Sequence, residues 1–182
     1  WFFNFFRDNK ISIKFERIQA KEKFMKIFFS IITVTYNSKE NLLRTIRSVQ
    51  SQNYKNYTHV IKDGLSNDKT NEIDFTKLEN TKFFESKDLG IYDAMNQALE
   101  LANNEFIIYL NSGDEFFSSN TLKKLSKQIS SNPNYYSYCG GTLQIDPFNN
   151  SFKRLIGLSR LYKYLPLAQL PHPSLISRKS VL

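Results

Sequence analysis

The stretch KIFFSIITVT, residues 26–35, decides the fold class of this 182-residue chain. It is a continuous run of β-branched and aromatic side chains, which is typical of a strand buried on both faces of a parallel sheet. The tripeptide YNS at 36–38 ends the run, and Ser38 is a residue type that caps helices. Apolar side chains then recur at helical spacing, at Leu42, Leu43, Ile46 and Val49. A buried strand followed by an amphipathic helix indicates an α/β fold.

The alternation of strand and helix continues along the chain. Strands are predicted at 58–62, 82–86, 105–110, 135–143 and 152–156, and helices at 91–103 and 120–131. Strands that alternate with helices form right-handed βαβ units, so we expect an open, mostly parallel, Rossmann-like sheet with helices on both faces. We interpret residues 1–24 as an N-terminal extension and residues 25–182 as one domain. Its C-terminal part is expected to be incomplete, because SLISRKSVL at 174–182 resembles the start of another strand–helix unit.

Basic residues gather at both ends of the chain, which has a formal net charge of +8. Residues 1–26 hold seven Lys or Arg and three acidic residues, and residues 147–182 hold six Lys or Arg and no acidic residue. Such flanks indicate contact with an anionic membrane surface or a phosphate-bearing substrate, but the solvated surface of a lysine-rich protein gives the same pattern. Aromatic and basic residues interleave only in residues 1–24, so no nucleic-acid partner is expected.

The number of cysteines and the hydropathy of the chain indicate its cellular compartment. Cys139 is the only cysteine, which excludes an internal disulfide and a cysteine-based metal cluster and fits a reducing compartment. No apolar run approaches the ~18 to 20 residues that a membrane-spanning helix needs. A cytoplasmic protein is therefore expected, with peripheral association at the inner face of the cell membrane as the role of its basic flanks.

Polar side chains follow the predicted strands at the point where each strand ends. Thr35 and Asn37 come after the first strand, Asp63 after the second, and Asn111 and Asp114 after the fourth. Ligands of open parallel sheets bind beyond the carboxyl ends of the strands, so these side chains are expected to converge. A divalent cation that binds a diphosphate often takes only one or two carboxylates, and Asp114 could supply one. The phosphate-binding motifs GxGxxG and GxxxxGK[ST] are absent.

Four ordered segments carry a resemblance to a known family. They are SIITVTYN (30–37), IKDGLSNDKT (61–70), ESKDLGIYDAMNQAL (85–99) and FIIYLNSGDEFF (106–117). Together they resemble the family 2 glycosyltransferases of the GT-A fold, in particular the branch that builds colanic acid, capsule and lipopolysaccharide chains. The segment LPHPS (170–174) is similar to one that this branch also carries.

The resemblance implies roles for individual residues. Thr35 and Asn37 lie where the family's first strand meets the nucleotide, Asp63 where a carboxylate hydrogen-bonds the base, and Asp88 near the donor's ribose or sugar. Asp114 takes the position of the acid that holds a divalent cation, Mg²⁺ or Mn²⁺. The full set of expected substrate-binding residues is Thr35, Asn37, Asp63, Asp88, Asp93 and Asn111.

The chain departs from the family pattern at two places. Asn111 and Gly113 stand where further aspartates are usual, and Gly141 stands where an aspartate often follows a glycine. The general base is therefore open, with His172 as the candidate catalytic residue and Asp93, Asp146 or a residue beyond Leu182 as alternatives. Structural roles compete as well: aspartates are ordinary turn residues, and acids near residue 91 are favoured by the dipole of the predicted helix.

The expected function is that of an inverting glycosyltransferase in bacterial surface polysaccharide synthesis. Its donor would be a UDP- or GDP-linked sugar and its acceptor a saccharide or a lipid-linked saccharide. The alternative is a truncated or degenerate domain that binds a nucleotide or sugar without turnover, which the thin acidic motif and the unassigned base favour.

Overall fold

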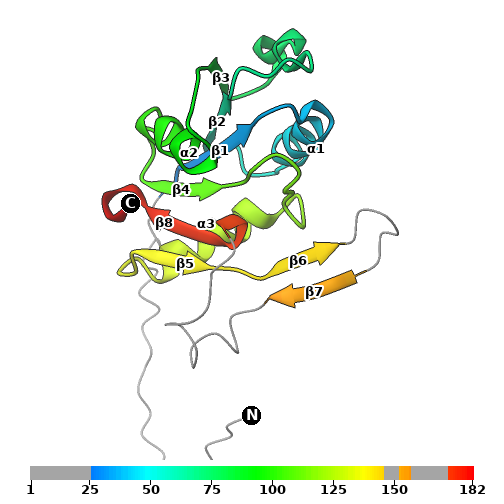
Figure 1. Ribbon diagram of the computed structural model, residues 1–182. Helices are drawn as coiled ribbons and strands as arrows, with labels where there is room; N and C mark the ends of the chain where they lie inside the picture. The colour runs from blue at the N-terminus through cyan, green and yellow to red at the C-terminus, as the bar shows by residue number, and fades with distance from the viewer. Residues whose placement is uncertain (1–25, 146–151, 157–171) are drawn as a thin grey trace, which may run out of the picture.

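The computed structural model describes residues 26–145, 152–156 and 172–182 (Figure 1). Its main sheet has six strands in the order β3-β2-β1-β4-β8-β5. Their bounds are β1 (Phe29–Thr35), β2 (Tyr57–Asp63), β3 (Thr81–Glu85), β4 (Phe106–Tyr109), β5 (Ser137–Cys139) and β8 (Leu175–Arg178). A separate two-stranded sheet pairs β6 (Thr142–Ile145) with β7 (Phe152–Ile156). Figure 1 shows this hairpin extending away from the main sheet.

Strands β1 to β4 run parallel to one another, with β1 between β2 and β4. The register pairs Thr35 of β1 with Asp63 of β2, and Asp63 with Glu85 of β3. All seven residues of β1 are buried, which agrees with its unbroken apolar run. The carboxyl ends of these strands therefore meet at one edge of the sheet, as the sequence predicts.

Helices cover both faces of the sheet, because successive side chains of each strand point to opposite faces. On one face α2 (Ile91–Glu100) packs Ala94, Met95 and Ala98 against even-numbered strand residues such as Ile32 and Val60. On the other face α1 (Lys39–Gln50) and α3 (Thr121–Ser131) pack against odd-numbered residues such as Phe29 and Ile31. The predicted open, mostly parallel sheet with helices on both faces is confirmed.

Strand β8 joins the sheet from far along the chain. It runs antiparallel to β4, with Ile108 opposite Ile176, and β5 is antiparallel to β8 in turn. The beginning of β8 therefore lies beside the end of β4. This direction carries the 3-10 turn His172–Ser174, which immediately precedes β8, to the same edge as the ends of β1 and β2.

One predicted strand is wrong. Residues 135–143 do not form a single strand: β5 ends at Cys139 and β6 begins at Thr142, in a different sheet. The chain leaves the main sheet at the two glycines between them. The N–H of Gly140 still donates to the carbonyl of Ser174 (2.7 Å), in register with the pairing of β5 and β8, and Thr142 then pairs with Ile156 of β7 instead. Between β2 and β3 the chain forms two 3-10 turns, Thr70–Glu72 and Phe75–Lys77. The predicted extension, residues 1–24, lies outside the described residues.

Candidate donor-binding site

The polar edge is built by the loops that follow β1, β2 and β4. Backbone hydrogen bonds continue the ladder past the strand ends: Gly64 N donates to Thr35 O (2.9 Å), and Ser112 N donates to Val34 O (3.3 Å). The three loops are thereby held side by side. The convergence of Thr35, Asp63 and the turn before Asp114 that the sequence predicts is present.

The carboxylate of Asp63 is completely buried and lies on the α1 side of the sheet. Its two oxygens accept hydrogen bonds from the backbone N–H of Ser66 (2.8 Å) and from the Ser66 hydroxyl (2.5 Å). The same hydroxyl accepts from the N–H of Asn37 (2.7 Å), and the side-chain oxygen of Asn37 accepts from the N–H of Asn67 (2.9 Å). Asp63 thus ties the loop after β2 to the loop after β1, and its contact with a nucleotide base stays a prediction.

A second carboxylate, Asp88, lies on the α2 side beside a buried lysine. Lys62 of β2 has no exposed side-chain surface, and its ammonium donates to the Asp88 carboxylate and to the carbonyl of Ser86 (2.9 Å). The other Asp88 oxygen accepts from Gly90 N (3.0 Å). Burial of Asp88, the largest influence, would raise the pKa of its carboxyl, but the Lys62 and Gly90 hydrogen bonds and the Lys62 charge together hold that pKa below its usual value.

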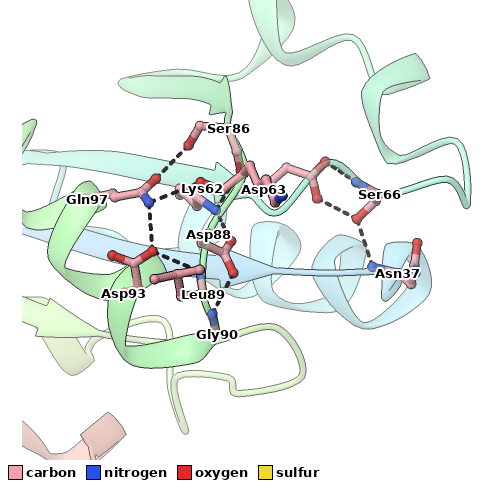
Figure 2. Close-up of polar contacts among 11 residues, drawn as sticks. Asn37, Lys62, Asp63, Ser66, Ser86, Asp88, Leu89, Gly90, Asp93 and Gln97 are labelled. Carbon is pink, nitrogen blue, oxygen red and sulfur yellow. Dashed lines mark hydrogen bonds and ion pairs between the residues drawn. The ribbon is translucent and has the colours of Figure 1, made fainter.

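Asp93 faces its own loop rather than the open edge (Figure 2). Its carboxylate accepts from the N–H of Leu89 (2.8 Å) and from the side-chain amide of Gln97 (3.0 Å). The Gln97 oxygen in turn accepts from the Ser86 hydroxyl (2.6 Å). This arrangement fits an acid that stabilises the first turn of α2. A role for Asp93 in substrate binding or as the base remains a prediction.

The loop that carries Asp114 is held by two buried hydroxyls of α1, those of Thr45 and Ser48. Thr45 Oγ1 donates to the carbonyl of Asp114 (2.9 Å) and accepts from the N–H of Gly113 (3.0 Å), and Asp114 N donates to Asn111 O (2.9 Å). Gly113 has φ +96, a conformation that glycine adopts without strain. Farther along, Phe116 N donates to Ser48 of α1 (2.7 Å). The turn LNSGD is therefore a fixed platform, not a loose connection.

Three buried oxygens at this edge have no partner among the described residues: Thr35 Oγ1, Asn111 Oδ1 and Ser112 Oγ. Buried polar atoms in folded proteins are nearly always hydrogen-bonded, so these oxygens are candidates for contact with a ligand. The fourth such atom, His59 Nδ1, belongs to a fully buried side chain within β2. The unpartnered oxygens thus concentrate where β1 and β4 end.

The residues present fit a divalent cation that is shared with a diphosphate. Asp114 supplies a carboxylate, and Asn111 and Ser112 supply neutral oxygens, which are the ligand types that Mg²⁺ and Mn²⁺ accept. Among the described residues, no three His, Cys, Asp or Glu side chains gather into a metal-binding group. A cation here would therefore complete its coordination with phosphate oxygens and water.

The chain matches the family model for glycosyl transferase family 2 over residues 30–177. It belongs to glycosyl transferase family 2. The matched range includes the loops after β1, β2 and β4 that build the polar edge.

Relatives and solved structures resemble this family 2 chain over about half of their own length. An uncharacterised glycosyltransferase of Mycobacterium tuberculosis is 28% identical over 76% of this chain and 50% of its own. The Escherichia coli protein WfaP, a UDP-Glc:alpha-D-GlcNAc-diphosphoundecaprenol beta-1,3-glucosyltransferase, is 34% identical over 55% of this chain and 39% of its own.

Two solved structures share the fold of this family 2 chain. TarS of S. aureus, also solved with UDP-GlcNAc, superposes with TM-score 0.64 and 22% identity over 86% of this chain. The mannosyltransferase PcManGT of Pyrobaculum calidifontis, in complex with GDP-Man and Mn²⁺, superposes with TM-score 0.63 and 16% identity over 85% of this chain. The GT-A fold expected from the sequence is confirmed.

The predicted base, His172, lies in the 3-10 turn before β8, at the edge where β4 ends. Its side chain lies outside the described residues, and so does the alternative Asp146. Catalysis by His172 therefore stays a prediction. Among the helices that the structure describes, none has the length and hydropathy to cross a bilayer.

Sequence reasoning missed Lys62, Ser66 and Thr45. The signal for Lys62 is a lysine within YTHVIKD, an otherwise buried strand. Ser66 has a local signal, because it lies three residues after Asp63 and the short side chain of aspartate often accepts from nearby backbone N–H groups. Thr45 has no local signal for this role, because its partners in the turn after β4 lie 66 to 69 residues away in the chain.

Proposed function

We propose that this chain is the donor-binding part of an inverting glycosyltransferase that uses a UDP- or GDP-linked sugar. The observation that carries the proposal is the cluster of unpartnered buried oxygens near Asp114, at the strand-end edge to which the family resemblance assigns the donor. One relative, WfaP, is named as a UDP-Glc-dependent glucosyltransferase, and solved structures of the same fold hold UDP-GlcNAc or GDP-Man, which supports a nucleotide-sugar donor.

The nucleoside would lie on the loops after β1 and β2. Tyr36 is 65% exposed, and its ring lies against Gly64, 3.2 Å from the place of a Cβ there. An exposed ring beside a glycine is a platform on which a base can stack. Asn37 and Asp63 hold this part of the edge together, and Asp88 borders it on the α2 side.

The diphosphate would lie over the turn after β4. Asp114 and Asn111 would hold a divalent cation there, which when bound stabilises the negative charge that the leaving diphosphate gains. Thr35 and Ser112 would donate hydroxyl protons to phosphate or sugar oxygens. Thr45 fixes the turn so that these groups keep their positions when the donor binds.

Inversion requires a single displacement at the anomeric carbon. The acceptor oxygen forms a bond to that carbon, the bond to the diphosphate oxygen breaks on the opposite face, and the acceptor proton passes to a base. We propose His172 as this base, because the direction of β8 brings its backbone to the edge where β4 ends.

The acceptor would be a saccharide or lipid-linked saccharide of a bacterial surface polysaccharide or glycolipid. WfaP acts on a diphosphoundecaprenol-linked sugar, and other family members are named for PGL/p-HBAD biosynthesis in Mycobacterium, where this chain is 29% identical over 56% of its length. Action at the cytoplasmic face of the membrane, with basic residues near anionic headgroups, agrees with such an acceptor.

Calorimetric titration with UDP and GDP, with and without Mn²⁺, tests the donor site. We expect binding that Mn²⁺ strengthens, with the Mn²⁺ effect lost in Asp114→Ala and kept in Asp74→Ala, an exposed carboxylate between β2 and β3 paired with Lys77. Binding that is indifferent to Mn²⁺ and to Asp114 would contradict the proposed metal site. Release of nucleotide from UDP- or GDP-sugars then measures turnover.

A second candidate is a domain that binds the nucleotide sugar without turnover. The observation that favours it is the thin acidic motif of the turn after β4, where Asp114 is followed by Glu115, which is paired with Arg44, and no group of three metal-binding side chains gathers among the described residues. Donor binding with no nucleotide release from any UDP- or GDP-sugar would support this candidate over the enzyme.

A further inference from the structure

Lys62 places a buried positive charge beneath the edge of the donor site. Its side chain is 0% exposed and leaves β2 on the α2 face, the face that Val60 also lines with apolar surface. Lysine is almost never fully buried unless it is paired, and an apolar side chain of similar volume often stabilises a fold as well or better. Stability alone therefore does not account for a lysine at this position.

The ammonium of Lys62 bonds to a single loop, the loop between β3 and α2. The Lys62 ammonium donates to the carbonyl of Ser86 (2.9 Å) and to the carboxylate of Asp88, whose other oxygen accepts from Gly90 N (3.0 Å). Both Asp88 oxygens are thus fixed in direction. Figure 2 shows Lys62 and Asp88 between the strand and the first turn of α2.

The fixed carboxylate borders the turn that follows Asp63. A Cβ added at Gly64 would lie 3.0 Å from Asp88 Oδ2 and 3.2 Å from Tyr36, so Gly64 is enclosed by a carboxylate and an aromatic ring. A side chain at this position would press on both groups, so glycine allows their close approach. The Lys62 bond therefore sets the position of Asp88 against the surface on which a nucleoside would lie.

We propose that Lys62 is a positioning residue of the donor site, which holds Asp88 as an ionised acceptor for the hydroxyl groups of the donor's ribose or sugar. The inference rests on the proposed function. Each carboxylate oxygen has two lone pairs, and the protein bonds to Lys62 and Gly90 N leave further lone pairs to accept from vicinal hydroxyls. An ionised acceptor favours a hydroxyl-bearing ligand because it has no proton to donate.

The charged or titratable groups around Asp88 come from three elements besides its own loop. They are Lys62 of β2, Tyr36 of the loop after β1, and Asp93 of α2, with Lys87 preceding Asp88 in the chain. Within the described residues, the side-chain bond to Asp88 comes from Lys62. Loss of the ammonium is thus expected to raise the pKa of the Asp88 carboxyl.

The experiment compares Lys62→Met with the wild-type chain and with Lys82→Met, which removes an exposed lysine of the adjacent strand β3. Carbon-13 NMR titration follows the Asp88 carboxyl, assigned with Asp88→Asn, and calorimetry follows UDP and GDP binding at pH 7 and pH 5. In Lys62→Met we expect the titration midpoint to rise and nucleotide affinity to fall about tenfold at pH 7 and further at pH 5. Lys82→Met should match the wild type in both readouts.

A double variant separates positioning from a purely structural role. Lys62→Met with Asp88→Asn removes both charges of the buried pair, so it keeps the fold even where a single change does not. If Lys62 acts through Asp88, the double variant binds nucleotide as Asp88→Asn does. Additive losses of affinity would overturn the inference, because they would mean that Lys62 supports binding independently of Asp88.

Failure of the proposed function is distinguishable from failure of this inference. Wild-type protein that binds neither UDP nor GDP would overturn the donor site, whereas the NMR titration would still report whether Lys62 keeps Asp88 ionised. An Asp88 midpoint that does not move in Lys62→Met, together with intact wild-type nucleotide binding, would overturn the role of Lys62 alone.

Discussion

The two halves of the polar edge use their oxygens in opposite ways. After β2 and β3 the carboxylates already accept hydrogen bonds from the protein: Asp63 accepts from Ser66, and Asp88 accepts from Lys62 and Gly90. At the ends of β1 and β4 the oxygens of Thr35, Asn111 and Ser112 are buried without a partner among the described residues. In one half, the bonded half, the protein's own bonds fix the direction of the oxygens before a ligand arrives, while in the other half, the open half, only a ligand can supply the missing bonds.

The largest expected effect tests this contrast in folding stability. Asp63→Ala leaves the N–H and hydroxyl of Ser66 without their buried acceptor, and we expect it to lower the free energy of unfolding by about 3 kcal/mol. Urea denaturation measures the change.

The matched variant on the open half is Ser112→Ala. It removes a buried hydroxyl that has no partner, so we expect the stability to stay within about 0.5 kcal/mol of the wild type while nucleotide binding weakens. Equal losses of stability in Asp63→Ala and Ser112→Ala would contradict the division of the edge into a bonded half and an open half.

The second prediction concerns His59, whose unpartnered Nδ1 lies within β2, away from the polar edge. His59 is fully buried, and burial lowers its pKa to about 3. Thr33 Oγ1 donates to Leu110 O (2.7 Å), so the Nε2–H of His59 donates to Thr33 (2.8 Å) and leaves Nδ1 as the bare nitrogen.

Below its unfolded pKa of 6.5, His59 takes up a proton in the unfolded chain but not in the folded one. The free energy of unfolding is thus highest above pH 6.5 and falls by about 1.4 kcal/mol per pH unit as the pH drops toward 3. At pH 5 the loss is about 2 kcal/mol. Denaturation between pH 5 and 7 should show this slope, and His59→Leu should reduce it. Nucleotide affinity at pH 7 should be the same in both proteins.

A smaller effect concerns the hydroxyl that supports the open half. Thr45→Val keeps the shape of the side chain but removes its bonds to Gly113 and Asp114, and we expect a loss of about 1 kcal/mol in stability. Binding of UDP or GDP with Mn²⁺ should weaken about tenfold because the turn loses its fixed position. Thr45→Ser retains the hydroxyl and serves as the control; if it loses as much as Thr45→Val, packing rather than hydrogen bonding positions the turn.

The smallest effect is a gain of stability in the bonded half. Leu65 has φ 64, a left-handed conformation that is costly for a bulky residue, and it is 51% exposed. Leu65→Gly removes the strain at some cost in unfolded-chain entropy, and we expect about 0.5 kcal/mol of net stabilisation. A lower melting temperature would show that the Leu65 side chain contributes packing that outweighs the backbone strain.

Local pattern was sufficient for much of the fold. The apolar run of β1 and the spacing of Ala94, Met95 and Ala98 follow directly from side-chain burial on a strand and on a helix. Local pattern failed at residues 135–143, because Cys139 pairs with Leu175 of β8 whereas Thr142 pairs with Ile156 of β7, and both partner strands lie farther along the chain. Bonds of that range leave no periodic signal in the sequence.

By itself, the sequence determined that polar residues follow buried strands, and hence that Thr35, Asp63 and Asp114 share one edge, because parallel strands align their carboxyl ends. Only the tertiary structure decided which of these oxygens are already bonded. That outcome depends on partners from other elements, such as Lys62 for Asp88 and Thr45 for the turn of Asp114. A hydrogen bond needs its two groups at about 3 Å, and only the folded chain sets that distance.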